Sequence, residues 1–216
     1  MPRRELITRL FQSIPTAERR AEGGEEIGII RGIPIVFNSR TDLGWFDEEI
    51  DPHALDGADL SDVRLCLNHD TSYVYARSRR TNPRSTMRFD IQPDGMHIEA
   101  DLAIGQSPRA ADMYSAVERE DMTGMSFMFS VDEDEWTGLD TDHPYRRIKK
   151  ISSVVEVSCV TFPAYEATSI EIDARCKEAL ENARSSLESE RQQSRRADES
   201  AELELLKLKT MILGGK

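Results

Sequence analysis

Apolar and polar residues alternate along most of the middle of the chain, which is the pattern of half-buried β-strands. The alternation is strongest where β-branched and aromatic residues gather between turn-forming residues, as in "VRLCLNH" and "MTGMSFMFSV". It predicts strands at residues 27–39, 63–69, 73–77, 86–91, 96–103 and 122–131, and two strands or one bent strand over 145–162.

The spacing changes in "SPRAADMYSAVERED", residues 107–121. Ser107 can cap a helix and Pro108 suits its first position. Apolar residues then recur at the i, i+3, i+4, i+7 spacing of one helix face, namely Ala110, Met113, Tyr114 and Val117. We expect one amphipathic helix here, a short helix near Pro52, and an acidic solvated loop over residues 132–144.

The two ends of the chain differ from its middle. Residues 1–25 are charged and end in "AEGGEE", which predicts a flexible lead-in. Residues 174–216 are dominated by helix-forming residues and predict a helical tail. The last turns of that tail place apolar residues on one broad side, so they need a partner surface: Leu203, Leu206, Leu208, Met211 and Ile212. The globular domain then covers residues 26–173.

Composition limits the classes of function. The net charge is −12 and the pI about 4.9, which disfavours nucleic-acid binding because phosphates require clustered Lys and Arg. Three cysteines without CxxC spacing favour reduced thiols in a cytoplasmic setting. The N-terminus has no uninterrupted apolar run typical of a secretion signal, and no segment approaches the ~20 apolar residues of a membrane span.

Three residues could together perform acyl transfer. A serine hydroxyl attacks only when a base takes its proton, and an imidazole is that base near neutral pH. A carboxylate in turn fixes the imidazole tautomer. These groups are present on three predicted strands, as Ser126, His69 and Glu156. Each residue taken alone also fits an ordinary structural role. In that interpretation His69 is a structural histidine, and Glu156 and Ser158 face solvent from one side of a strand.

A metal site is the rival interpretation, and it is weak. Four histidines and many carboxylates could in principle bind a metal in a metal-dependent hydrolase, but none has HExxH spacing: His53, His69, His97 and His143. The acidic stretch at residues 132–135 lacks the glycine of a calcium loop. We therefore expect no metal and no cofactor.

Five stretches resemble the prohead (capsid maturation) proteases of tailed bacteriophages with the Hong Kong-type capsid. These enzymes belong to the assemblin-like serine peptidases, together with the herpesvirus maturational proteinases. The matching stretches lie within residues 28–172, in the family's order: "GIPIVFNSRTDLGWFDEEIDPHAL", "LCLNHD", "GMHIEADL", "MTGMSFMF" and "VEVSCVTFPAYEATSI". The resemblance implies that His69 and Ser126 are catalytic, and that Glu156 is the third member. Asp70 is the runner-up for that third role, and the donors of the oxyanion hole stay open.

With the strand pattern, the resemblance predicts an α+β fold, a mostly antiparallel β-barrel like that of the herpesvirus enzymes, with surrounding helices. It implies a peptidase inside the assembling prohead, in the host cytoplasm. That peptidase would cleave the scaffolding segment from the major capsid protein precursor, and finally itself, and it could self-associate. The alternative is a non-enzymatic capsid scaffold or assembly protein with a degenerate protease domain, which the helical tail and the acidity would suit.

Overall fold

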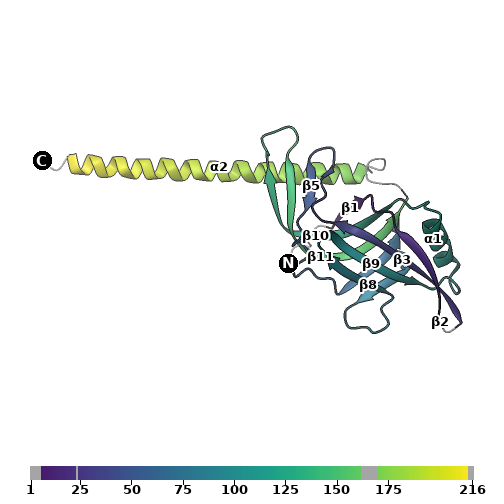
Figure 1. The fold of residues 1–216 in the computed structure, drawn as a ribbon. Helices are drawn as coiled ribbons and strands as arrows, with labels where there is room; N and C mark the ends of the chain where they lie inside the picture. The colour runs from purple at the N-terminus through teal and green to yellow at the C-terminus, as the bar shows by residue number, and fades with distance from the viewer. Residues whose placement is uncertain (1–5, 23, 162–169, 214–216) are drawn as a thin grey trace.

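The computed structural model describes residues 6–22, 24–161 and 170–213, whose strands form two sheets (Figure 1). The larger sheet has seven strands: β1 (Ile7–Phe11), β4 (Thr41–Asp42), β5 (Asp47–Ile50), β6 (Asp62–Leu67), β7 (Ala76–Arg79), β10 (Gly124–Thr137) and β11 (Tyr145–Val160). The smaller sheet has the order β2-β3-β9-β8: β2 (Thr16–Glu22), β3 (Glu25–Val36), β8 (Met87–Gln92) and β9 (Gly95–Leu102). The predicted α+β class, with mostly antiparallel strands, is confirmed.

The predicted closed barrel is wrong, and the reason lies in β11. This strand pairs antiparallel with β10 along one edge. Its other edge pairs parallel with two short strands in succession, β5 at Tyr145–Ile148 and β6 at Glu156–Cys159. The larger sheet therefore divides beyond β11 into two short pairs of strands, β5 with β4 and β6 with β7. Neither is joined to β1 by strand pairing, so the described residues form no closed barrel.

The acidic stretch after residue 131 is strand, not loop. β10 runs on to Thr137, and its acidic residues face basic partners on β11, with Glu133 opposite Lys150 and Glu135 opposite Arg147. Opposite charges on directly facing residues stabilise an antiparallel pair. The stretch looks like a loop when it is considered without the basic strand that it pairs with.

One hydrophobic core joins the two sheets. Met125, Phe127 and Phe129 of β10 are fully buried in it, as the alternation predicts. The sheets approach closely at Gly32 of β3, where an added Cβ would lie 2.3 Å from the Sδ of Met125. The absence of a side chain at Gly32 therefore leaves room for Met125, the residue before Ser126 on β10.

The predicted helix at residue 107 is present as α1 (Pro108–Glu118). The Ser107 hydroxyl accepts a hydrogen bond from the backbone N–H of Ala110, as an N-cap residue does. The four apolar positions expected on its inner face are all buried: Ala110, Met113, Tyr114 and Val117. The short helix expected near Pro52 is instead a run of turns over residues 52–57.

The N-terminal segment is not the flexible lead-in that its charge predicts, because its described residues supply β1 and β2. β1 adds to β10 and β2 adds to β3. The charged residues mislead here because Arg9 is buried and bonds to the Glu48 carboxylate of β5. The segment is attached to the fold by strand pairing, by this buried ion pair and by Phe11, which is buried and stacks on Phe127.

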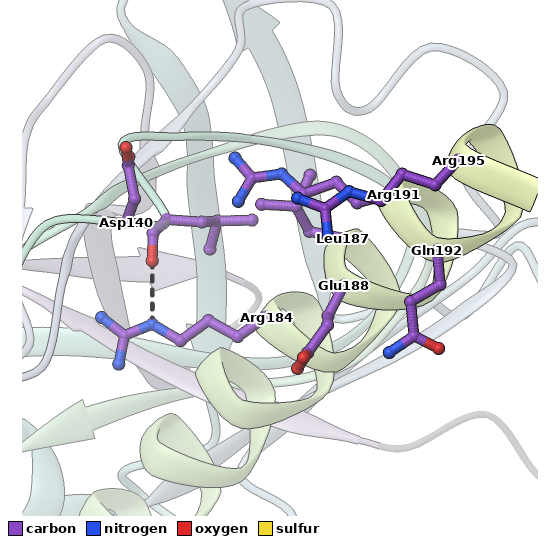
Figure 2. Close-up of a pocket in the computed structure, with 8 residues that line it drawn as sticks. Asp140, Arg184, Leu187, Glu188, Arg191, Gln192 and Arg195 are labelled. Carbon is purple, nitrogen blue, oxygen red and sulfur yellow. Dashed lines mark hydrogen bonds between the residues drawn. The ribbon is translucent and has the colours of Figure 1, made fainter. Parts of the chain in front are cut away.

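The C-terminal helix α2 (Ile170–Leu213) confirms the helical tail and starts four residues earlier than expected. Its first turns pack Cys176 and Leu180 against Phe46. Arg184 then donates hydrogen bonds to the backbone carbonyls of Leu139, at 3.0 Å, and Thr141, at 2.7 Å, in the β10–β11 loop. Figure 2 shows the first of these bonds as a dashed line from Arg184. Beyond this attachment α2 projects away from the sheets (Figure 1).

Within the described residues, no helix has the length and apolar character needed to cross a bilayer.

Candidate active site

The strands β10, β11 and β6 bring the predicted site residues onto one face of the larger sheet. Ser126 of β10 is directly opposite Ser158 of β11, and Ser158 faces Cys66 of β6. Directly opposite residues point to the same face of a sheet, and so do residues two apart on one strand. Ser126, Ser158 and Glu156 therefore share a face. The reading in which this face meets solvent is wrong, because all three residues are buried.

His69 lies in the turn that follows β6, not on the strand where the alternation places it. The backbone of Asn68 and His69 is left-handed, with φ of 50° and 62°. Asn tolerates this region well, whereas other residues persist in it when their surroundings hold them there. The turn is tied to the end of β11: Asn68 donates its N–H to the carbonyl of Cys159, at 3.0 Å, and accepts from the N–H of Thr161, at 3.0 Å.

The turn brings the imidazole of His69 onto the carboxylate of Glu156. The distance from Nδ1 to Oε2 is 2.8 Å, although the residues are 87 apart in sequence. A carboxylate at Nδ1 favours the tautomer with its proton there, which leaves Nε2 as an acceptor. Nε2 is buried and has no hydrogen-bond partner in the part of the chain that the structure describes. The bond to Glu156 thus orients the imidazole, and Nε2 is left as a nitrogen that could accept a proton.

Ser126 is adjacent to this pair but does not bond to it. Its hydroxyl donates to the backbone carbonyl of Arg9 on β1, at 2.7 Å, and the residue is 0% exposed. The structure thus joins His69 and Glu156 directly. It places Ser126 on the same face, one strand away, with its proton directed towards β1.

Asp70, the alternative third member, is used differently. Its carboxylate accepts from the backbone N–H of Ser72, at 3.0 Å, and from the Ser72 hydroxyl. These bonds shape the turn and do not involve the imidazole. Glu156, and not Asp70, is therefore the carboxylate that bonds to Nδ1 of His69.

Two residues of this neighbourhood escaped the sequence analysis as site residues. Ser158 bonds both to the backbone of His69 and to the Glu156 side chain. Its position two residues after Glu156 on one strand was the available signal. Arg9 contributes only its carbonyl to Ser126, and no sequence signal points to a backbone atom.

Two buried thiols lie close enough to Glu156 for its charge to affect their pKa. Burial, together with the negative charge of Glu156, raises the pKa of both Cys66 and Cys159 to about 12. The three cysteines, all within the described residues, form no disulfide, and the buried Cys66 and Cys159 act as small apolar residues.

The histidines do not gather into a metal site. Each has its own carboxylate neighbour, since His53 bonds to Asp56, His97 to Asp94 and His69 to Glu156. Among the described residues, one group places three ligand atoms within 4.8 Å of one another: Asp42, Asp47 and His143. Asp47 pairs with the Tyr145 end of β11, far along that strand from Glu156, and already accepts a bond from Arg40.

A groove of about 380 Å³ lies between the β10–β11 loop and α2 (Figure 2). Its lining includes Asp140, Leu187 and Arg191 but none of the three predicted site residues. It therefore belongs to the attachment of the helix and not to the candidate active site.

Comparison with known proteins gives the family. The sequence model of the caudovirus prohead serine protease family matches residues 15–183. The prohead protease of Enterobacteria phage HK97 is 37% identical over 161 residues, which are 73% of this chain and 65% of that protein, so the chain spans just under two thirds of that relative. A solved structure of the bacteriophage T4 capsid assembly protease has a TM-score of 0.41 and 11% identity over 74% of this chain and 99% of that one, a likeness that supports no structural argument. On the family match and the HK97 relative, the chain belongs to the caudovirus prohead serine proteases.

Proposed function

We propose that this chain is a serine endopeptidase in which Ser126 is the nucleophile, His69 the general base and Glu156 the residue that orients the base. The observation that carries the proposal is the 2.8 Å bond from His69 Nδ1 to Glu156, with Nε2 buried and unused. Family membership supports the serine class. The shared face of Ser126 and Glu156 supports the choice of serine.

In the proposed reaction, Nε2 of His69 takes the Ser126 proton as Oγ bonds to the scissile carbonyl carbon. The tetrahedral intermediate collapses when the protonated imidazole gives that proton to the leaving amine, which breaks the peptide bond and leaves an acyl-serine. Water then attacks the acyl carbon as Nε2 takes one of its protons. The imidazolium returns a proton to Oγ as the acyl–oxygen bond breaks, which releases the acid and free Ser126. Glu156 stabilises the imidazolium that forms in each half.

The arrangement of Ser126 corresponds to a resting state of this reaction. The hydroxyl bonds to the Arg9 carbonyl, and the side chain has no exposed surface. For the proposed proton transfer, the hydroxyl must give up that bond and direct its proton to Nε2 of His69. A substrate must also displace whatever covers Ser126.

For the substrate we propose the scaffolding segment of the major capsid protein precursor, and finally the chain itself, inside the assembling prohead in the host cytoplasm. The name of the HK97 relative, a prohead protease, supports the setting. A non-enzymatic assembly protein is disfavoured because such a protein has no use for a buried imidazole–carboxylate pair beside a serine.

For α2 we propose docking against that scaffolding segment. Residues 188–207 of the helix are exposed throughout, and Leu203 and Leu205 are each 55% exposed. An isolated helix gains most of its stability from packing, so exposed leucines near its end favour a partner. We also propose that residues 188–202 form an exposed tether that contains the self-cleavage sites. This stretch is continuous helix, so cleavage there requires local unwinding.

The test is co-expression with the capsid precursor followed by mass measurement of every product. Ser126→Ala and His69→Ala should each abolish cleavage while the far-UV circular dichroism stays unchanged, because triad members act as a unit. Ser130→Ala is the matched control, since Ser130 is a buried serine four residues along the same strand. Cleavage that persists in purified Ser126→Ala particles contradicts the serine mechanism.

A further inference from the structure

Ser158 occupies the centre of the candidate active site although it is not one of the three reacting groups. It is fully buried on β11, directly opposite Ser126 on one side and Cys66 on the other. Its side chain therefore lies between the nucleophile strand and the strand that leads into the His69 turn. A residue in this position can influence both.

The Ser158 hydroxyl makes two hydrogen bonds whose directions are fixed by their partners. The backbone N–H of His69 can only donate, so Oγ is the acceptor of that 3.0 Å bond. The hydroxyl proton is then directed to Oε1 of Glu156, which accepts it. The other carboxylate oxygen, Oε2, accepts from Nδ1 of His69. The bonds close a ring that starts at the His69 backbone and ends at the His69 side chain.

This closed ring constrains the imidazole from both ends. The bond to the backbone N–H helps to hold His69 at its left-handed φ of 62°. The bond to Oε1 turns the carboxylate so that Oε2 faces Nδ1. Each bond of the ring depends on the others, because a rotation of Glu156 would break its bonds to both neighbours.

We propose that Ser158 is a positioning residue that fixes both the tautomer and the direction of the His69 ring through this hydrogen-bond ring. The proposal rests on the proposed function, because a fixed imidazole is of use only to a proton transfer at Nε2. Ser158 itself does not touch the substrate carbonyl.

The first measurement does not need proteolysis. It follows the His69 ring nitrogens by NMR during a pH titration of the full chain carrying Ser126→Ala, which prevents self-cleavage. Adding Ser158→Ala should shift the titration midpoint of His69 and mix its two neutral tautomers. Adding Ser158→Thr keeps a hydroxyl and should restore the parent behaviour. Ser152→Ala is the matched control, because it removes a serine hydrogen bond from the same strand, to the Ser130 carbonyl.

The second measurement is the pH dependence of precursor cleavage with Ser126 intact. Ser158→Ala should lower kcat about 10- to 100-fold with little change in KM, since the loss of a buried hydrogen-bond partner has an effect of this size. The lower limb of the pH–rate profile should move with the NMR midpoint. Ser158→Cys fills the same volume with a weak donor, and should act in the same direction if Ser158→Ala fails to fold.

The outcomes separate the two proposals. Unchanged His69 titration and kcat in folded Ser158→Ala, or in Ser158→Cys, overturn the positioning role. A loss of kcat that Ser158→Thr does not rescue, with an unchanged His69 titration, also overturns it, because that pattern indicates a purely structural residue. A changed titration in a chain whose wild-type form cleaves nothing supports the hydrogen-bond ring and contradicts the protease function.

Discussion

At the scale of single residues, the site is defined by which hydrogen-bonding atoms are used. Both oxygens of Glu156 accept bonds, Nδ1 of His69 is bonded, and Nε2 is buried without a partner among the described residues. The Ser126 proton is directed to Arg9. In the proposed mechanism these two atoms, Nε2 of His69 and Oγ of Ser126, must come together for the proton transfer.

Glu156→Gln tests the third role. Ser158 and His69 Nδ1 bond to different oxygens of Glu156, and a glutamine replaces one of these oxygens by an NH₂ group, so one of the two donors loses its acceptor. An NH₂ group at Nδ1 also favours the wrong tautomer. We expect kcat for precursor cleavage to fall about 10²- to 10⁴-fold, less than for His69→Ala. Asp70→Asn is the control, because its carboxylate bonds to Ser72 and not to the ring. Wild-type rates in both Glu156→Gln and Glu156→Ala would remove Glu156 from the mechanism.

The sequence and the resemblance predict His69, Ser126 and Glu156 as site residues, and the structure puts His69 in contact with Glu156 and Ser126 on the same face. The spacing of Ser158 from Glu156 places it on that face, but its bond to His69 joins residues 89 apart and depends on the pairing of β11 with β6, which no local pattern reveals. The turn at His69 is also not predicted, because the alternation of "VRLCLNH" continues past the end of β6. Residues 162–169, which include the whole "PAYEATS" stretch of the resemblance, lie outside the described residues.

At the scale of elements, β1 is the clearest failure of pattern reading. "ITRLF" is short and charged, and its attachment depends on Arg9, whose guanidinium donates to Glu48 while Arg146 donates to the same carboxylate at 3.0 Å. Burial by itself would raise the pKa of Glu48, but the attraction of Arg9 and Arg146 lowers it. A buried acid between two buried arginines is a tertiary contact that no local window reveals.

Arg9→Ala should therefore destabilise the fold, because it leaves the buried Glu48 with one cation in place of two. We expect a loss of about 3 kcal/mol, the low end for breaking a buried pair, since Arg146 stays. Urea unfolding monitored by circular dichroism measures it. Arg119→Ala is the control: Arg119 pairs with Asp121 at the surface, with both side chains more than half exposed, and should cost less than about 1 kcal/mol. Equal unfolding midpoints for the two variants would contradict this role of Arg9.

At the scale of the whole molecule, most strands in the middle of the chain and α1 follow from periodicity, and α2 from composition, but β1, β2 and the division into two sheets do not. Strand partners are decided by contacts between distant segments, and β11 takes its parallel partners β5 and β6 from roughly a hundred residues earlier. The same limit applies to the tail. Its helical character is local and predictable, whereas its attachment depends on the distant residues Phe46 and Leu139.

That attachment changes where the tail can be cut. Removal of everything after Asp173 deletes Cys176 and Leu180 and would expose Phe46, which is fully buried. Such a chain should lose stability, so its absence from proheads could reflect unfolding and not a loss of recruitment. A chain ending at Glu190 keeps these contacts and the Arg184 bonds. It removes only exposed helix and the final turns, where the side chains from residue 208 onward are outside the described set.

We expect the chain ending at Glu190 to unfold at the wild-type temperature but to be missing from proheads assembled beside the capsid precursor. Full-length Leu203→Gln/Leu205→Gln should show the same defect, because it keeps the helix and removes exposed apolar surface from the proposed docking segment. Gln192→Ala/Gln193→Ala, in the polar half of the helix, should be incorporated normally. The measurement is the amount of protease in purified proheads, with Ser126→Ala in every chain to prevent self-cleavage.

Normal incorporation of the shortened chain would rule out recruitment through α2. A defect confined to the shortened chain would assign recruitment to the length of the helix and not to its leucines.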